Sequence, residues 1–281
     1  LQDGAPVLVQ VPRRGYAPSL ACLRDRTPAR CTACSGPLQA TSGHAIASCR
    51  WCGHLAGDWR CPVCQGRQLR ASVIGARRTA EELGRAFPGV TVRTSGRDEV
   101  LTGVPGGASL VVATPGAEPV ADGGYGAVLL LDGWSLLTRA DLRAGEEALR
   151  RWMAAAALSR PGGRVVVVAD RGLAPVQALV RWDPAGAAAR ELADRSALGF
   201  PPVTRMASVS GSPAAVADLL AHLTVGEVLG PVPDGDGERA FVRVPRAEGA
   251  TLAAALKTAA GVRSARKAEP VRVEMDPLSL T

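Results

Sequence analysis

Residues 22–64 read CLRDRTPARCTACSGPLQATSGHAIASCRWCGHLAGDWRCPVC and contain all seven cysteines of this 281-residue chain. The cysteines form three Cys-x2-Cys pairs and one incomplete pair, in which Asp25 stands three residues after Cys22. A Cys-x2-Cys turn points two thiolates at one ion, and two such turns complete the tetrahedron of a zinc site. Three pairs supply six ligands, so two closed sites need one more ligand beside Cys22. Because a carboxylate oxygen also binds zinc, Asp25 is the first choice, and His44 and His54 are the other candidates.

Other uses of the cysteines fit this pattern less well. An odd number of cysteines, clustered in Cys-x2-Cys turns within a chain of ordinary length, is unlike the disulfide framework of a small secreted protein. A redox site needs one reactive pair near a strand–helix–strand unit, not a ladder of pairs. Catalytic zinc keeps one coordination position open, whereas here every position is filled. The cysteines therefore predict two structural zinc ions.

Composition and charge narrow the class of partner. The chain carries 33 Lys and Arg against 26 Asp and Glu, a net charge of +7 with a sequence pI near 9.4, which favours a polyanionic partner. Seven thiolates and two Zn²⁺ ions would lower that charge to roughly +4. The chain starts with Leu1, and it has no signal peptide or long apolar run. We therefore expect no membrane insertion and a chain that starts partway through a longer gene product.

Most of the remaining chain alternates between apolar strands and helices, which predicts an α/β fold with a mostly parallel sheet. Continuously apolar segments are typical of parallel strands that are buried on both faces. The cysteine-rich stretch is then an insertion after the first strand of this sheet. We expect strands at 6–11, 69–75, 90–94, 109–114, 126–133 and 163–170, and helices at 78–87, 139–158, 174–180 and 185–198.

The sequence Phe200-Pro201-Pro202 marks a boundary, after which the order of elements changes. The later pattern predicts the βαββαβ order of a ferredoxin-like α+β domain, which implies no function by itself. The elements are expected at 205–210, 213–223, 225–229, 239–244, 249–259 and 270–274. The predicted domains are therefore residues 1–20 together with 69–199, a zinc-binding insertion over 21–68, and a C-terminal α+β domain over 200–281.

Two places combine arginine with an aromatic side chain, as nucleic-acid-binding sites do. Arg13, Arg14 and Tyr16 follow the first strand and could contact phosphate and stack a base, although a solvated turn explains them as well. Arg50 and Trp51 stand at the tip of the third cysteine pair and form a second candidate. The alternative there is that a tryptophan caps the small core between the two metal sites.

No catalytic constellation stands out in the α/β part. The chain has neither the GxxxxGK[ST] loop nor the GxGxxG turn of nucleotide-binding α/β proteins. Asp132 and Asp170 end apolar strands, where α/β proteins place functional groups. Neither has a histidine, a serine nucleophile or a second carboxylate nearby in sequence. Aspartates in this position commonly cap helices or anchor loops, so neither is predicted to be catalytic.

Taken together, these features resemble the C-terminal half of the PriA family (primosomal protein N′), the bacterial replication-restart helicases, and the resemblance covers essentially the whole chain. It rests on the four metal pairs and on VPRRGYAPSLAC (11–22), LGFPPVTRMASV (198–209), VLGPVP (228–233) and PVRVEMDPLSL (270–280). It implies that residues 1–199 without the insertion form the second, RecA-like lobe of a helicase, and that the C-terminal domain is a small ribosomal-protein-like fold. It also implies a nested pairing of the zinc ligands, with one ion on Cys22, Asp25, Cys61 and Cys64 and the other on Cys31, Cys34, Cys49 and Cys52.

Two segments depart from the family pattern. Residues 113–119, ATPGAEP, stand where the family carries a GT-Q-x-x-x-KG-x-[DH] segment that couples DNA to ATP. Residues 153–160, MAAAALSR, stand where it carries Q-x-x-GRAGR, so that Leu158 replaces the first arginine and Arg160 is a candidate remnant. An arginine finger is worth roughly 10³–10⁵ in rate in phosphoryl-transfer enzymes. We therefore expect ATP-driven translocation to be lost, as in the degenerate, non-helicase form of the family associated with actinobacteria.

The resemblance thus implies a replication-restart protein without helicase activity, which binds forked or single-stranded DNA in the cytoplasm, at the nucleoid. The expected partners are the replicative helicase, other primosome proteins and single-stranded-DNA-binding protein, with the zinc-binding insertion as the protein contact surface. Two structural zinc ions are the expected cofactors, and whether ATP still binds is left open. Two other hypotheses remain: an active ATP-dependent 3′–5′ helicase whose Walker motifs lie in an N-terminal half, and a freestanding zinc-ribbon protein that binds nucleic acid.

Overall fold

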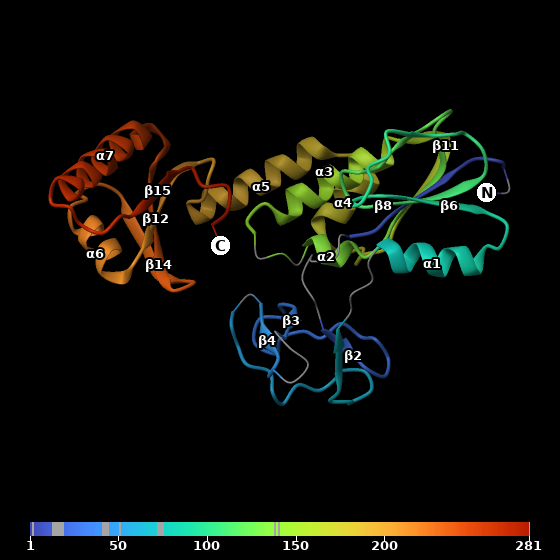
Figure 1. Cartoon of the computed structure of the whole chain (residues 1–281), viewed down its shortest axis with the longest axis horizontal. Helices are drawn as coiled ribbons and strands as arrows, with labels where there is room; N and C mark the ends of the chain where they lie inside the picture. The colour runs from blue at the N-terminus through green and yellow to red at the C-terminus, as the bar shows by residue number, and fades with distance from the viewer. Residues whose placement is uncertain are drawn as a thin grey trace. The chain divides into compact units, whose positions relative to one another are not determined.

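A computed structural model of the chain describes residues 1, 3–12, 20–40, 45–50, 52–71, 76–137, 139 and 141–280. The chain divides into two compact units, Leu1–Pro184 and Ala185–Thr281. Figure 1 draws both, and in it the cysteine-rich insertion consists of short strands and loops. No helix in the described part of the chain is long and apolar enough to cross a bilayer.

Unit 1 is built on a parallel sheet of five strands in the order β11-β10-β1-β8-β6. Its central strand β1 (Val7–Gln10) is buried at every position, as the continuous apolar run predicts. The parallel α/β sheet expected from the sequence is therefore confirmed. The other strands are β6 (Thr91–Ser95), β8 (Ser109–Ala113), β10 (Tyr125–Leu130) and β11 (Ser159–Val167).

Helices cover both faces of this sheet. Helix α1 (Ala76–Ala86) packs on the face that carries Val9 and Val112, and α3 (Ala144–Ala156) contacts β10 and β11. Because side chains alternate along a strand, the apolar residues between them point to the opposite face. Leu8, between Val7 and Val9, is completely inaccessible, so the second face of β1 is covered as well, and Trp152 of α3 is also completely buried. The shorter helices of this unit are α2 (Gly133–Leu137) and α4 (Ala174–Arg181).

The single helix expected over 139–158 is wrong in its first turn and a half. In the structure α2 ends at Leu137 and α3 begins at Ala144. The Asp141 carboxylate accepts a hydrogen bond from the Arg143 N–H at 2.9 Å, and the Asp141 carbonyl accepts one from Ala144 at 3.0 Å. A short polar side chain that bonds its own backbone competes with the helix, which explains the late start.

The cysteine module, defined here as residues 20–71, is held by two short antiparallel pairs. Strand β2 (Leu20–Cys22) pairs with β5 (Leu69–Ala71), and β3 (Leu38–Gln39) pairs with β4 (Ser48–Cys49). The strand expected over 69–75 thus closes the base of the module instead of joining the parallel sheet, and residues 72–75 lie outside the described part. A further short parallel pair in unit 1 joins β7 (Gly103–Val104) to β9 (Val120–Ala121).

Unit 2 starts with α5 (Pro184–Leu198) and continues with a four-stranded antiparallel sheet in the order β13-β14-β12-β15. Its core joins sheet residues such as Val209 and Val242 to Val216 and Leu252 of the two helices. The order of helices and strands is the one that the sequence pattern predicts. The elements are β12 (Thr204–Gly211), α6 (Pro213–Ala221), β13 (Glu227–Asp234), β14 (Gly237–Pro245), a 3-10 turn (Arg246–Glu248), α7 (Gly249–Ala265) and β15 (Arg272–Met275).

Candidate metal centre

Four backbone turns of one kind carry the eight candidate ligands. In each turn the fifth residue donates its N–H to the carbonyl of the first ligand, at distances of 3.0–3.1 Å. The N–H of that first ligand donates in return to the carbonyl of the sixth residue, at 2.8–2.9 Å. The turns begin at Cys22, Cys31, Cys49 and Cys61.

The fifth residue of each turn has a positive φ angle. The values are 63° at Arg26, 59° at Ser35, 72° at Gly53 and 58° at Gln65. This left-handed conformation is unfavourable for a residue with a side chain, yet three of the four positions are not glycine. The turn that contains Asp25 therefore has the same backbone conformation as the three Cys-x2-Cys turns, so Asp25 occupies the place of a fourth second-position cysteine.

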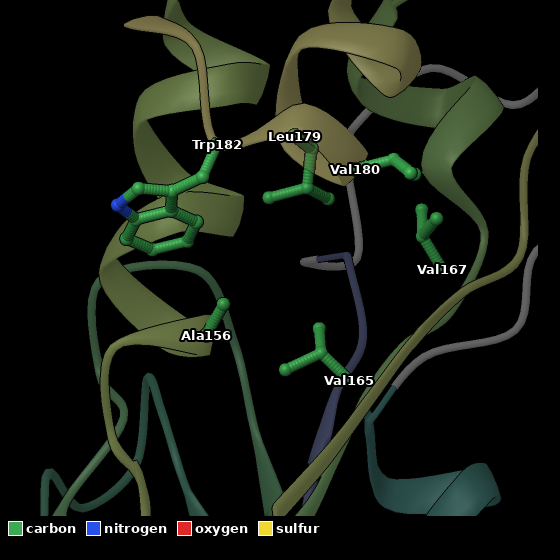
Figure 2. A pocket seen from close by; sticks show the side chains of 6 residues that line it. All are labelled: Ala156, Val165, Val167, Leu179, Val180 and Trp182. Carbon is green, nitrogen blue, oxygen red and sulfur yellow. The ribbon is translucent and has the colours of Figure 1, made fainter. Parts of the chain in front are cut away.

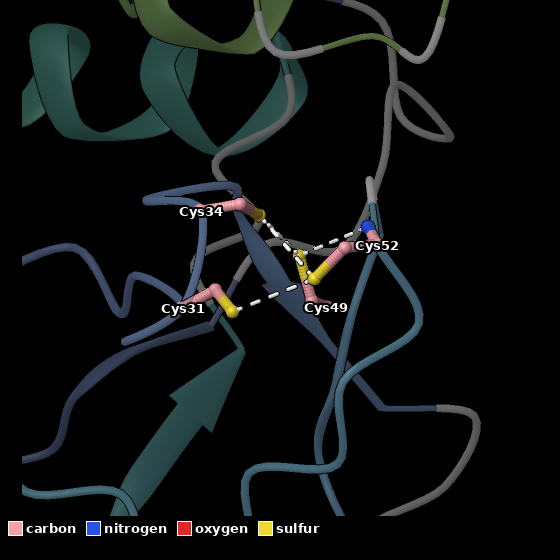
Figure 3. A group of neighbouring side chains, drawn as sticks. All are labelled: Cys31, Cys34, Cys49 and Cys52. Carbon is pink, nitrogen blue, oxygen red and sulfur yellow. Dashed lines mark hydrogen bonds between the residues drawn. The ribbon is translucent and has the colours of Figure 1, made fainter.

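One group of four sulfurs comes from the second and third turns, and we call it the four-cysteine site. Figure 3 shows the four side chains pointing toward one another. The Sγ–Sγ distances are 3.4 Å for Cys34–Cys49 and for Cys34–Cys52, and 3.7 Å for Cys31–Cys52. A tetrahedron with metal–sulfur bonds of about 2.3 Å has edges of roughly 3.8 Å, whereas a disulfide would need about 2.05 Å. The sulfurs thus have the spacing of metal ligands.

The second group comes from the first and fourth turns, and we call it the aspartate site. Cys22 Sγ lies 3.4 Å from Cys64 Sγ, and Cys61 Sγ lies 3.2 Å from Asp25 Oδ2. The other carboxylate oxygen, Oδ1, accepts the N–H of Thr27 at 2.9 Å, which fixes the orientation of the carboxylate. The four ligand atoms of each site lie within 4.8 Å of one another, so each site can hold one metal ion.

The structure therefore brings together the two ligand sets that nested pairing implies. His54 belongs to neither group of ligands. In the third turn its backbone carbonyl accepts a hydrogen bond from the N–H of Cys49. His44 lies outside the described residues. The residues that the sequence pattern did not single out are the amide donors, such as Thr27, Ala33 and Val63, whose N–H groups point at the ligands.

Electrostatics within the two sites favour a bound cation. The N–H of Thr27 holds the pKa of the Asp25 carboxyl well below its usual range. The N–H of Gly36 favours the Cys34 thiolate, but the sulfurs of Cys52 and Cys49 outweigh it and raise the pKa of Cys34 to about 12. Four neighbouring anions cannot form without a positive charge between them, and a divalent metal ion supplies that charge. The donor sets, four thiolates and three thiolates with a carboxylate, suit Zn²⁺.

Trp59 completes the interior of the cysteine module. Its side chain is only 5% exposed, and its indole Nε1 donates to the Arg30 carbonyl at 3.2 Å. Trp59 thus lies in the interior of the module, whereas the alternative raised for the tryptophan at the third cysteine pair falls on Trp51, outside the described residues. Of the candidate nucleic-acid contacts, Arg50 is half-buried and its N–H bonds the Pro37 carbonyl at 3.0 Å. The remaining candidates lie outside the described residues: Arg13, Arg14, Tyr16 and Trp51.

Among the described residues, the strand-end aspartates of unit 1 belong to no cluster that could hold a metal ion. Asp170 anchors a loop by accepting the N–H of Gly172 at 2.8 Å, and burial raises the pKa of Asp132. A cavity of about 300 Å³ lies among β11, α3 and α4, and Figure 2 shows that it is apolar. None of its described lining residues carries a titratable or metal-binding side chain. Its lining residues are Ala156, Val165, Val167, Leu179, Val180 and Trp182.

Comparison with known proteins gives consistent matches along the chain. The family model described as "Primosomal protein N C-terminal domain" matches residues 196–278. The chain is 50% identical to the "Probable replication restart protein PriA" of Mycobacterium tuberculosis (strain CDC 1551 / Oshkosh) and 51% identical to the protein of the same name from Mycobacterium leprae (strain TN). Both matches cover 100% of this chain but only 47% and 46% of the relatives, so the chain spans about half the length of the curated relatives it matches.

Proposed function

Since the chain is a PriA C-terminal region, we propose that it serves replication restart by binding forked DNA and recruiting the replicative helicase, without acting as a helicase itself. The observation that carries the replication-restart role is the similarity over the whole chain to proteins with that name. The two metal sites support this role, because the four turns that form them are the most specific feature of the resemblance to PriA.

Zinc has a structural role in this proposal. Cys31, Cys34, Cys49 and Cys52 would hold one ion, and Cys22, Asp25, Cys61 and Cys64 the other. Each ion supplies the positive charge that keeps its four anionic ligands together and thereby folds the module. Neither site offers an open position for substrate, so the metals take no part in a reaction. The folded module then serves as a protein contact surface.

The absence of a motor is supported by the turn that follows β8. Residues 114–118 form a compact turn in which Ala117 N–H bonds the Thr114 carbonyl at 2.9 Å, in the place of the family's DNA-to-ATP coupling segment. Arg160, the candidate remnant of the arginine motif, is the second residue of β11 and pairs with Asp3 at 3.7 Å. Leu158, in the place of the first arginine, carries no charge. These replacements remove the groups that couple hydrolysis to movement.

We assign the parts of the chain as follows. Residues 1–20 with 69–199 correspond to the RecA-like second lobe, residues 21–68 to the zinc-binding insertion, and residues 200–281 to a ferredoxin-like domain. The sheet order β13-β14-β12-β15, with two helices between its strands, supports the last assignment. DNA contacts are proposed for Arg13, Arg14, Tyr16, Arg50 and Trp51, in a cytoplasmic, nucleoid-associated complex with primosome proteins and single-stranded-DNA-binding protein.

The test is ATP turnover by the complete gene product, with and without forked DNA, together with fork binding at several salt concentrations. We expect fork binding that weakens steeply with salt, because arginine–phosphate contacts release counterions, and no stimulation of hydrolysis by DNA. Clear DNA-stimulated hydrolysis with strand separation would replace the proposal by the active-helicase hypothesis. Absence of fork binding would instead favour a protein scaffold that contacts only other proteins.

A further inference from the structure

The carboxyl edge of the parallel sheet is the place where an α/β protein of this topology would bind an anion. Strands β1 and β8 are neighbours and end together, with Gln10 opposite Ala113. From β1 the chain leads through α1 to β6 on one side of the sheet, and from β10 through α3 to β11 on the other. This reversal makes a topological switch point between β1 and β10, and in open α/β sheets ligands bind outside the carboxyl ends of the strands at such a point, where Gln10 ends β1.

A carboxylate of the chain itself occupies this edge. Gln10, the last residue of β1, donates from Nε2 to Glu118 Oε1 at 2.6 Å. The backbone N–H of Gly116 donates to both oxygens of Glu118, at 3.0 and 2.9 Å. Gln10 is 108 residues away in sequence and only 2% exposed, so a buried amide from the middle of the sheet is aimed at this anion. Charge-assisted bonds of this kind are the strong ones.

The guanidinium of Arg151 lies beside these donors and is itself paired with Glu147. Gly116 has a φ of +88°, and a side chain at this position would clash with the guanidinium of Arg151. That guanidinium is held by Glu147, whose Oε1 accepts from Arg151 Nε at 2.7 Å, and the Arg151 carbonyl accepts a weaker bond from Gln10 Nε2 at 3.4 Å. An amide, a backbone N–H and an arginine packed against that backbone together form a cradle suited to an oxyanion.

We propose that Gln10, Gly116 and Arg151 form an oxyanion site at the carboxyl edge of the sheet, and that Glu118 fills it permanently as an internal ligand. The class of external ligand that fits is a carboxylate or a phosphate. Because Glu118 is tethered two residues from Gly116, its effective concentration at the donors exceeds that of any free anion. The site is therefore closed in the native chain. This inference stands on the geometry of unit 1 alone and does not depend on the role in replication restart.

The experiment is chemical rescue of the full chain with zinc bound. Glu118→Ala removes the internal carboxylate and leaves space, whereas Glu118→Gln fills the same space with a neutral amide. Glu81→Ala is the matched control, because Glu81 pairs with Arg77 on the exposed surface of α1. Thermal unfolding of each variant is measured in sodium acetate, in inorganic phosphate and in sodium chloride of equal ionic strength.

We expect Glu118→Ala to lower Tm by about 5 °C in chloride, because the buried amide of Gln10 and the exposed N–H of Gly116 lose a charged partner. Acetate should restore at least about 2 °C of this loss in Glu118→Ala and nothing in Glu118→Gln or Glu81→Ala. Rescue by phosphate as well would define a general oxyanion site, and rescue by acetate alone a carboxylate site. Equal responses of all variants to acetate would overturn the proposal.

A charge exchange keeps the test decisive if Glu118→Ala does not fold. Gln10→Glu alone places two carboxylates at the cradle and should lower Tm by more than Glu118→Gln does. Combining Gln10→Glu with Glu118→Gln restores one carboxylate and one amide across the same contact. The double variant should therefore be more stable than Gln10→Glu alone. If the changes in Tm caused by the two substitutions simply add, Gln10 is not a specific partner of Glu118 and the site does not exist.

Discussion

The cysteine module and the parallel sheet of unit 1 are neighbours in sequence, but each is stabilised internally by a different kind of interaction. The sheet buries apolar residues on both faces, with Leu8 and Val9 of β1 fully inaccessible. The module has a small interior, and four of the ten buried residues in its described part are candidate metal ligands. Apolar burial stabilises a fold gradually, residue by residue, whereas a metal site with four ligands is either complete or lost. The difference predicts that the two regions respond independently to substitution.

The largest effect is expected from Cys31→Ser in the four-cysteine site. It should release one of two zinc ions and unfold the module, because structural zinc contributes about 10–16 kcal/mol of binding free energy, comparable with the stability of a whole domain. Metal analysis and limited proteolysis measure the two effects. Thr32→Ala, in the same turn but exposed, is the control and should keep two ions. Two ions in Cys31→Ser would exclude the ligand set proposed for this site.

The converse substitution is Leu8→Ala in the sheet. Removing a fully buried leucine should lower the free energy of unfolding by about 2–5 kcal/mol and leave both metal ions in place. Denaturant unfolding together with metal analysis tests this separation. Val180→Ala, at a position that is 70% exposed, should change stability little. Loss of zinc in Leu8→Ala would mean that the two regions fold as one cooperative unit.

The aspartate site allows a finer comparison between two kinds of ligand. Asp25→Ala should weaken metal binding at this site by more than about 100-fold, since even residues that only orient a ligand contribute roughly 10–100-fold. Asp25→Cys should keep or tighten the site, because the turn already has the backbone of a Cys-x2-Cys pair. Competition with a chelator measures both, with Asp58→Ala as the control. Loss of zinc from Asp25→Cys would point to a histidine ligand instead.

The smallest expected effect on stability comes from removing the ion pair that Glu147 forms on α3. Arg150, and then Arg151, lower the pKa of Glu147 to about 2 from its ordinary 4.5. When folding lowers the pKa of a carboxyl group, the ionised group stabilises the fold at any pH above its pKa in the unfolded chain. This stabilisation is lost as the pH falls to its pKa in the folded protein. Glu147→Gln should therefore cost at most about 1 kcal/mol at neutral pH, given solvent screening, and the difference should vanish between about pH 4.5 and 2. A difference that stays constant with pH in thermal unfolding would contradict this origin.

The sequence by itself determined the features that depend on neighbouring residues. A Cys-x2-Cys turn is a local backbone conformation, so its spacing predicted the candidate ligands and made Asp25 the first choice for the eighth, with His44 and His54 as the alternatives. Continuously apolar strands predicted a parallel sheet, and the central strand β1 is buried on both faces, whereas Val165 and Val166 of the edge strand β11 are exposed. The late start of α3 at Ala144 was missed because the hydrogen bond of Asp141 to its own backbone competes with a helix that the apolar pattern favours.

Only the tertiary structure decided which distant segments meet. Spacing along the chain leaves open whether the first turn pairs with the second or with the fourth, and the folded chain brings Asp25 to Cys61. The pairing of β5 with β2, and the bond from Gln10 to Glu118 across 108 residues, have no local signal either. The physical reason is that hydrogen bonds and metal ligation act over about 3 Å. Which groups come that close depends on the path of the whole chain.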